Sequence, residues 1–441
     1  TGSQCVAVGV DALGAQVSGA HYNVAVGHSA LKASTTASNN TAVGFSALLA
    51  NTDGFSNTAI GSGAGDAITT GDRNTIIGHD AGSTLVEGSD NVFIGQLAGN
   101  ATAGSHNTAV GQQALEVNST GAANVAIGKQ ALEANTTADN SVAIGNETLR
   151  NNTTGGNNTG VGYSALNINS TGSGNTAVGF GAADAYNANN ITAVGYAALG
   201  AATTGGGNVA VGYNALAANT TGDNNTAVGY ETMESTTTGT NNTAFGSQAL
   251  DAHTTSHSNS AFGFGAGGGI TTGGNNQCLG NSAGNDALTT ITTGSNNLVV
   301  GNNSTSVAEV KVDWTVGSDA RDKTDIENLP DNAGLNFVNQ MRPVTYVWDN
   351  RTNYYPHTHE KYGERDHSKK STIKQVGFIA QEIKDIEDSI GWTDDHLVNT
   401  SNEKSWKLMY SQITPILVKA VQELSAEVEE LKSKSHEKCD K

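Results

Sequence analysis

The sequence predicts two folds in one chain: a mainly β repeat with coils of about 17 residues, followed by a small α+β domain that ends in a long coiled-coil helix. Three observations support this prediction. A pentad that ends in glycine recurs through the first 303 residues, the composition changes near residue 318, and apolar residues follow a heptad pattern near the C-terminus. We expect a β-roll or solenoid shaft over 1–303, a linker or tip over 304–317, and a globular module over 318–441.

The glycine that ends each N-T-A-V-G-like pentad sets the period of the repeat. Most intervals are 17 residues, two are 16, the first is 18 and the last is 21, with glycines at Gly9, Gly27, Gly44, Gly61, Gly78, Gly95, Gly111, Gly128, Gly145, Gly162, Gly179, Gly195, Gly212, Gly229, Gly246, Gly263, Gly280 and Gly301. A fixed period this short predicts a solenoid or roll with one coil per repeat.

Each coil divides into an extended part and a turn. Residues 225–229 form a typical pentad, and the Asn, Thr and Gly residues of 219–224 supply a turn, since Gly and Asn tolerate positive φ. A second apolar pair follows most pentads, as in Ala47-Leu48, Ala114-Leu115, Ala131-Leu132, Ala215-Leu216 and Ala249-Leu250. We expect the Val of the pentad and the Leu of the pair to fill the core.

The apolar surface of one coil is small beside the conformational entropy lost when 17 residues are ordered. Three chains around a shared axis would bury more, and the recurrent Gly and Ala suit close packing there. The repeat therefore favours a homotrimer, and a monomeric β-solenoid is the alternative.

The overall charge and the cysteine pattern exclude several functions. The formal net charge is −19, which argues against a nucleic-acid ligand because phosphate neutralisation needs basic patches. No apolar run approaches the roughly 20 residues of a membrane span. Cys5, Cys278 and Cys439 are scattered without metal-ligand spacing or a disulfide framework. We expect no cofactor, no metal and no membrane insertion.

Residues 318–441 have ordinary globular composition: all four prolines of the chain lie here, whereas 51 of its 55 glycines precede residue 318. We expect strands over 344–348 and 376–380, a short helix over 381–390 and a long helix over about 411–433.

The long helix carries a heptad seam. Its apolar positions step by 4, 3, 4 and 3 residues, at Leu417, Val421, Leu424, Val428 and Leu431. This spacing predicts a three-stranded coiled coil beside a repeat that favours a trimer. The alternative is an amphipathic helix that packs on its own domain.

Ser318 and Lys323 lie five residues apart where the two compositions meet, next to Gly317. A serine hydroxyl becomes an effective nucleophile when a base takes its proton. A lysine amine acts as that base when burial, here on trimer formation, favours its neutral form. The alternative is a solvated loop in which the Ser and the Lys are incidental.

The repeat resembles known fibrous proteins. The N-T-A-V-G units and the N-S-V-A-I-G unit at 140–145 are similar to head repeats of trimeric autotransporter adhesins, and to repeats in phage tail-fibre shafts. Over 1–303 this resemblance implies a left-handed parallel β-roll.

A second resemblance rests on four motifs taken in order. They are S-D-A-R-D-K at 318–323, M-R-P-V at 341–344, G-F-I-A-Q-E at 377–382, and Tyr410-Ser411 leading into A-V-Q-E-L at 420–424. Together they resemble the C-terminal intramolecular chaperone domain of endosialidases and other phage tail spikes and fibres. The resemblance implies a domain over 318–441 that trimerises, guides folding of the fibre and then cuts itself off between Gly317 and Ser318. It also implies that Ser318 is the nucleophile and Lys323 its base, with Gln375 where some members have His.

These patterns together predict a homotrimeric phage tail fibre, located in the virion and assembled in the host cytoplasm. It would attach to a host-surface receptor, a glycan or an outer-surface protein, with residues 302–314 as a candidate tip. One alternative is a cell-surface trimeric adhesin or extracellular filament that keeps its C-terminal domain, and another is a glycan-degrading tail spike. His357 and His359 form a weaker candidate metal site on a trimer axis.

Overall fold

The computed structural model describes most of the chain as two compact units, Thr1–Ser304 and Thr305–Lys441. Within these units the structure describes residues 4–17, 19–286, 290–302, 304–305, 323–349, 361, 364–368, 370–392, 396–400 and 406–439.

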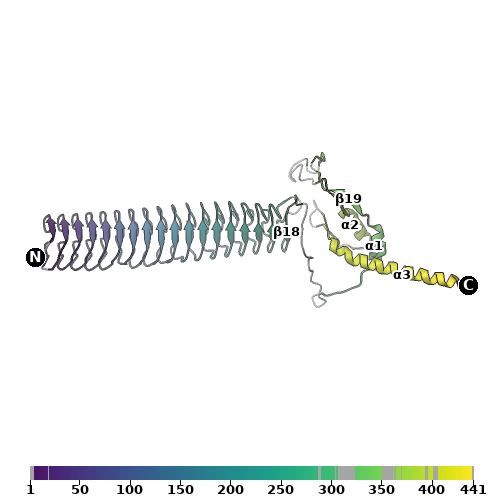
Figure 1. The fold of residues 1–441 in the computed structure, drawn as a ribbon, viewed down its shortest axis with the longest axis horizontal. Helices are drawn as coiled ribbons and strands as arrows, with labels where there is room; N and C mark the ends of the chain where they lie inside the picture. The colour runs from purple at the N-terminus through teal and green to yellow at the C-terminus, as the bar shows by residue number, and fades with distance from the viewer. Residues whose placement is uncertain are drawn as a thin grey trace. The chain divides into compact units, whose positions relative to one another are not determined.

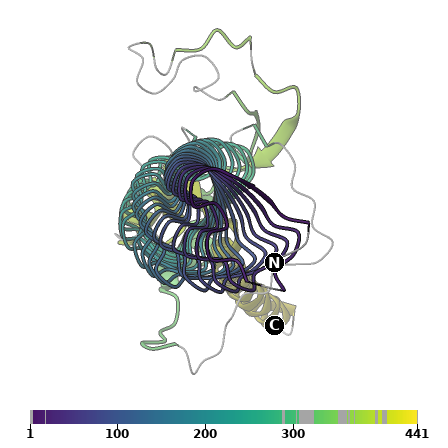
Figure 2. The ribbon, with the colours of Figure 1, turned by 90° about the vertical axis from the view of Figure 1, so that its left-hand side faces the viewer.

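The first unit is a parallel β-solenoid of three-residue strands, one per coil (Figure 1). The strands are β1 (Val6–Val8), β2 (Val24–Val26), β3 (Thr41–Val43), β4 (Thr58–Ile60), β5 (Thr75–Ile77), β6 (Val92–Ile94), β7 (Thr108–Val110), β8 (Val125–Ile127), β9 (Val142–Ile144), β10 (Thr159–Val161), β11 (Thr176–Val178), β12 (Thr192–Val194), β13 (Val209–Val211), β14 (Thr226–Val228), β15 (Thr243–Phe245), β16 (Ser260–Phe262), β17 (Gln277–Leu279) and β18 (Leu298–Val300). Each strand pairs in parallel with the next, so that equivalent residues stack, as in Thr226↔Thr243. Figure 2 shows the coils superposed along the axis of the solenoid. The predicted repeat fold is confirmed.

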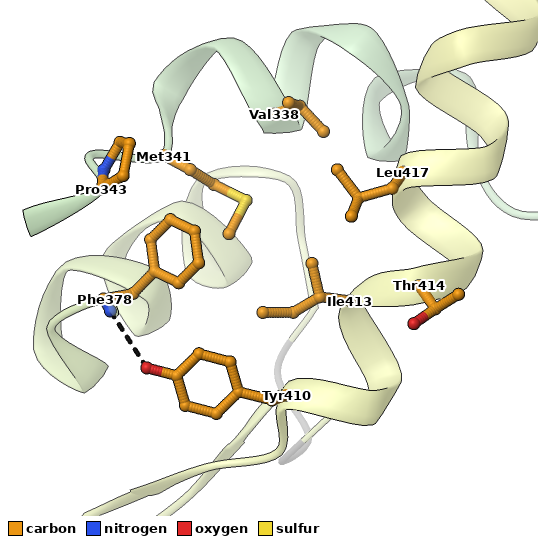
Figure 3. Close-up of a pocket in the computed structure, with 8 residues that line it drawn as sticks. All are labelled: Val338, Met341, Pro343, Phe378, Tyr410, Ile413, Thr414 and Leu417. Carbon is orange, nitrogen blue, oxygen red and sulfur yellow. Dashed lines mark hydrogen bonds between the residues drawn. The ribbon is translucent and has the colours of Figure 1, made fainter. Parts of the chain in front are cut away.

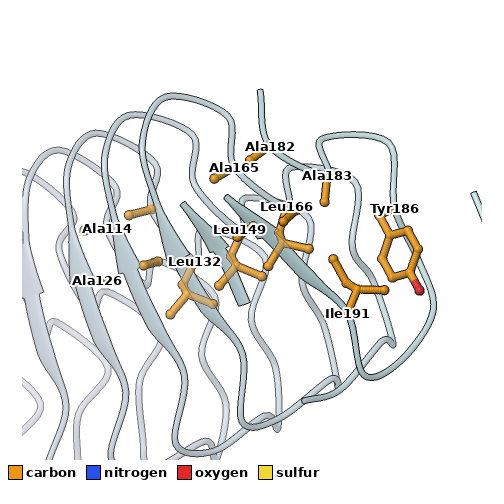
Figure 4. Packing of buried hydrophobic residues seen from close by; sticks show 14 of the residues in the cluster. Ala114, Ala126, Leu132, Leu149, Ala165, Leu166, Ala182, Ala183, Tyr186 and Ile191 are labelled. Atoms are coloured by element: carbon orange, nitrogen blue, oxygen red, sulfur yellow. The ribbon is translucent and has the colours of Figure 1, made fainter. Parts of the chain in front are cut away.

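Small side chains fill the interior of the solenoid. In one coil Ala126, Ala131 and Leu132 are all fully buried, and the equivalent residues of neighbouring coils line up with them (Figure 4). The Ala-Leu pairs are therefore core residues, as predicted. Because these residues are buried within a single chain, the solenoid closes its own core without a second copy.

The Val or Ile of the pentad lies outside the core, contrary to our expectation. Its neighbour Ala points inward, and successive residues of a strand face opposite sides. The outward position leaves Ile127 and Ile144 each 39% exposed. In the stacked coils these residues form an outer apolar stripe, whose exposed members are Val8, Ile60, Ile94, Ile127, Ile144, Val178, Phe245, Phe262, Leu279 and Val300.

A row of aromatic rings lies beside part of this stripe, at the residue after the pentad glycine. Five successive coils place an exposed ring there, and neighbouring ring centroids are 5.1–5.3 Å apart with nearly parallel planes. The rings belong to Tyr163, Phe180, Tyr196, Tyr213 and Tyr230.

The Asn at the first position of most pentads forms a buried ladder that joins the coils. The Asn57 amide N–H donates to Asn40 Oδ1 at 2.8 Å, and Asn57 Nδ2 donates to the Gly71 carbonyl at 2.7 Å, at the end of its own coil. Fourteen coils have a buried Asn here: Asn23, Asn40, Asn57, Asn74, Asn91, Asn107, Asn124, Asn158, Asn175, Asn208, Asn225, Asn242, Asn259 and Asn276. The ladder satisfies backbone groups that burial would otherwise leave unpaired.

A second polar ladder runs through the turns. Asn135 Nδ2 donates to Asn118 Oδ1 at 2.7 Å, and Asn169 Nδ2 donates to Asn152 Oδ1 at 3.0 Å. The same place in a later coil holds His253, which is fully buried with Nδ1 3.0 Å from Thr236 Oγ1.

His253 is expected to make the solenoid sensitive to acid. Burial lowers the pKa of His253 from 6.5 to about 4, because desolvation penalises the imidazolium. Between these pH values the unfolded chain binds more protons than the folded chain. Protonation of His253 therefore leaves the free energy of unfolding unchanged above pH 6.5 and lowers it by about 3 kcal/mol as the pH falls toward 4. Urea unfolding at pH 7.5 and pH 4.5 measures this loss, and His253→Asn should reduce it. An unchanged pH dependence in the variant would contradict the assignment.

The described part of the second unit has a compact core under three helices. Its helices are α1 (Leu335–Gln340), α2 (Ala380–Ser389) and α3 (Ile413–Cys439), with 3₁₀ turns η2 (Asp331–Ala333) and η4 (Tyr410–Gln412). Its strand pairs are β19 (Val344–Val347) with β20 (Lys374–Gly377), and β21 (Val398–Asn399) with β22 (Lys407–Leu408), both antiparallel.

The four predicted elements of this unit are present with shifted bounds. The strand expected over 376–380 begins and ends earlier, because Ala380 already opens α2. Helix α1 and the pair β21–β22 were not predicted. Phe337 of α1 is fully buried against Ile383 and Ile416, so α1 is part of the core that supports α3.

Candidate functional site

Helix α3 is attached to its own domain by one face near its N-terminus. Ile413, Ile416 and Ala420 are each at most 5% exposed, and the two isoleucines belong to the domain core. Pro415 lies in the first turn, where a missing N–H does not break the helix. The face that packs on the domain is therefore defined by three residues that the heptad analysis did not single out.

A carboxylate fastens the same part of α3 to α1. The Leu335 amide N–H donates to Glu423 Oε2 at 2.6 Å, and Lys419 Nζ lies 3.3 Å from Glu423 Oε1. The Leu335 hydrogen bond and the Lys419 ammonium lower the pKa of Glu423. The interaction satisfies an N–H at the start of α1, where Gly334 offers no side-chain cap.

The domain leaves the five heptad residues of α3 exposed. They are 41–65% exposed: Leu417, Val421, Leu424, Val428 and Leu431, which we call the trimer seam. Helix α3 therefore packs on its own domain through a different face, and the predicted coiled coil stays a prediction. An apolar stripe of this length on a helix is typical of a coiled-coil contact.

Two further residues extend the seam toward the N-terminus. Tyr410 and Thr414 precede Leu417 by 7 and 3 residues, so they continue the alternation of 4 and 3, and both are exposed. The spacing of 4 and 3 residues is present in the sequence at both positions. A heptad pattern of purely apolar residues does not include them, because Tyr and Thr carry hydroxyl groups.

Two interactions hold the ends of α2. Arg342 forms a two-point ion pair with Glu382, in which Nε lies 3.1 Å from Oε2. Glu387 is fully buried and accepts the Leu397 amide N–H at 2.6 Å, which joins α2 to β21. Both interactions therefore fix α2 within the domain on which α3 packs.

The predicted cleavage junction is only partly described. Gly317 and Ser318 lie outside the described residues, as do His357, His359 and most of the predicted tip. Lys323 is described and is exposed in the single chain. The pairing of Ser318 with Lys323 remains a prediction. Gln375 lies in β20, opposite Tyr346 of β19.

The described part of the chain contains no group of three or more His, Cys, Asp or Glu residues placed to hold a metal ion. None of its helices is both long and apolar enough to span a bilayer.

Comparison with known families gives one match. A family model described as "Chaperone of endosialidase" matches residues 318–391, which include β19, β20 and α2 and end before α3. No curated protein and no solved structure matches the chain. The match begins at Ser318, where the composition changes, and covers the first part of the 318–441 module.

A parallel β-solenoid followed by a small domain with an exposed helical seam defines a fibre protein with a C-terminal assembly module. Residues 318–391 are similar to the endosialidase chaperone family. The whole chain fits a tail fibre or tail spike with a C-terminal chaperone domain, and the family match suggests trimer formation.

Proposed function

We propose that this chain is the shaft of a homotrimeric phage tail fibre that attaches the virion to a host surface. Its C-terminal domain drives trimerisation and folding, and is then removed by self-cleavage between Gly317 and Ser318. The exposed trimer seam on α3 is the observation that carries this proposal, because its own domain leaves it uncovered.

Two surfaces of the solenoid support the proposal. The outer apolar stripe offers an extended contact for two further copies, which the closed core of one chain does not use. The exposed row of aromatic rings offers an extended contact for a glycan or an outer-surface protein of the host. Assembly in the host cytoplasm and residence in the virion follow from this function.

The proposed cleavage needs one nucleophile and one base. Ser318 Oγ attacks the Gly317 carbonyl carbon while the Lys323 amine takes the hydroxyl proton. The bond from Gly317 to the Ser318 nitrogen breaks, that nitrogen receives the proton, and Gly317 becomes an ester of Oγ. Water then hydrolyses the ester, which leaves a carboxylate on Gly317 and a free amine on Ser318.

Ser318→Ala is expected to abolish cleavage. Denaturing electrophoresis of freshly expressed wild type should show two pieces, 1–317 and 318–441, whereas the variant should remain one chain of 44.9 kDa. Ser433→Ala, which removes an exposed hydroxyl from α3, is the matched control and should cleave normally. An intact wild type would contradict self-cleavage and leave a fibre that keeps its C-terminal domain. Cleavage in Ser318→Ala would contradict the assigned nucleophile.

A further inference from the structure

An apolar cavity of about 290 Å³ opens beside the first turns of α3 (Figure 3). Its walls come from three parts of the domain: Val338 and Met341 at the end of α1, Phe378 after β20, and α3 itself. The Phe378 amide N–H donates to Tyr410 Oη at 3.1 Å, so a polar group on the wall is already bonded. The cavity therefore suits an apolar side chain.

The cavity is continuous with the trimer seam. Tyr410, Thr414 and Leu417 line it, and all three occupy heptad positions of the seam. The steps of the seam place Leu417, Leu424 and Leu431 at heptad position d and Val421 and Val428 at position a. Ile413 is then at the flanking g position, and it also lines the cavity. The cavity thus lies at the N-terminal end of the face that a coiled coil would use.

The domain covers one edge of α3 and leaves the other bare. Ile413 and Ala420, both g positions, are at most 5% exposed. Val418, on the e edge, is 52% exposed. Three copies around a shared axis have parallel helices. In a parallel coiled coil the g edge of one helix faces the e edge of the next. The g position of one heptad then meets the e position of the following heptad, which pairs Ile413 with Val418 of a second copy.

We propose that the cavity is the docking site for the Val418 edge of a second copy of this chain. Each copy offers a cavity on its g side and Val418 on its e side, so three head-to-tail contacts close a ring. The inference rests on the proposed trimer and adds its register: Val418 of one copy lies against Val338 of the next.

Cysteine cross-linking between two kinds of chain tests this contact. Chains with Val338→Cys and chains with Val418→Cys, each in a background without Cys5, Cys278 and Cys439, are co-expressed with distinguishable tags. A disulfide joining both tags can form only between copies, and it requires Cβ atoms about 3.5–4.5 Å apart. We expect this mixed disulfide at least tenfold above a control pair.

The matched control replaces Val418→Cys by Ser425→Cys, on the same exposed edge one heptad farther along. Light scattering of the same samples without oxidation reports the assembly state. Trimers whose mixed disulfide does not exceed the control would overturn the docking site and leave the proposed trimer intact. Monomers would overturn both.

Discussion

An aspartate in place of Leu424 is expected to convert the assembled protein from trimers to monomers. Leu424 is the central residue of the trimer seam and is 48% exposed in the single chain, so in the proposed trimer its stabilising contacts come from other copies. Three buried leucines contribute about 1.5–3 kcal/mol each, and three carboxylates on one axis would also repel each other. The lost contacts alone correspond to more than a thousandfold weaker association.

Light scattering on the full chain measures this effect. Ala426→Asp introduces the same charge two residues away on an exposed position outside the seam, and it should remain trimeric. Equal trimer content in the two variants would show that the seam is not the interface. Dissociation of both would indicate a general effect of acidic charge on the helix.

We expect the second large effect from Gly212→Ala, which adds one methyl group to the backbone. Gly212 has φ +138°, and a Cβ there would lie 2.2 Å from the carbonyl oxygen of Gly229 in the next coil. Backbone atoms on both sides cannot yield without separating β13 from β14. We expect Gly212→Ala to cost about 3 kcal/mol or more, from backbone strain and the lost pairing.

Hydrogen exchange in Val209–Val211 and Thr226–Val228 locates the damage to these two strands. Gly206→Ala is the matched control, because φ at Gly206 is not positive and the nearest atom to its added Cβ is 3.4 Å away. The control should keep its protection, as Gly→Ala at a compatible site is neutral or stabilising. Equal protection in both variants would refute the proposed role of the close coil contact.

The solenoid was predictable because the regular spacing of the pentad glycines gives its period. Each pentad glycine has positive φ, and those from Gly9 to Gly280 lie against the next coil, so their spacing reports the length of a coil directly. The direction of the pentad side chains was not predictable. Strands of three residues alternate once, and sequence alone does not say whether Ala126 or Ile127 faces inward.

In the C-terminal module, too, one feature was predictable from the sequence and another was not. The steps from Leu417 to Leu431 indicated the seam, and the structure leaves it exposed. However, Ile413, Ile416 and Ala420 also follow a helical spacing, so α3 has a second apolar face. Only the position of α1 decides which face the domain covers, and α1 is too short to have a clear periodicity. The Glu423 contact with Leu335 spans 88 residues and has no local signal.

The most direct test of this account follows the native mass of the full chain after expression, beside Ser318→Ala. We expect an initial trimer of about three times 44.9 kDa, which becomes a trimer of 1–317 and releases residues 318–441. The variant should stop at the first trimer. Wild type that remains monomeric throughout, or that cleaves before it assembles, would contradict the account.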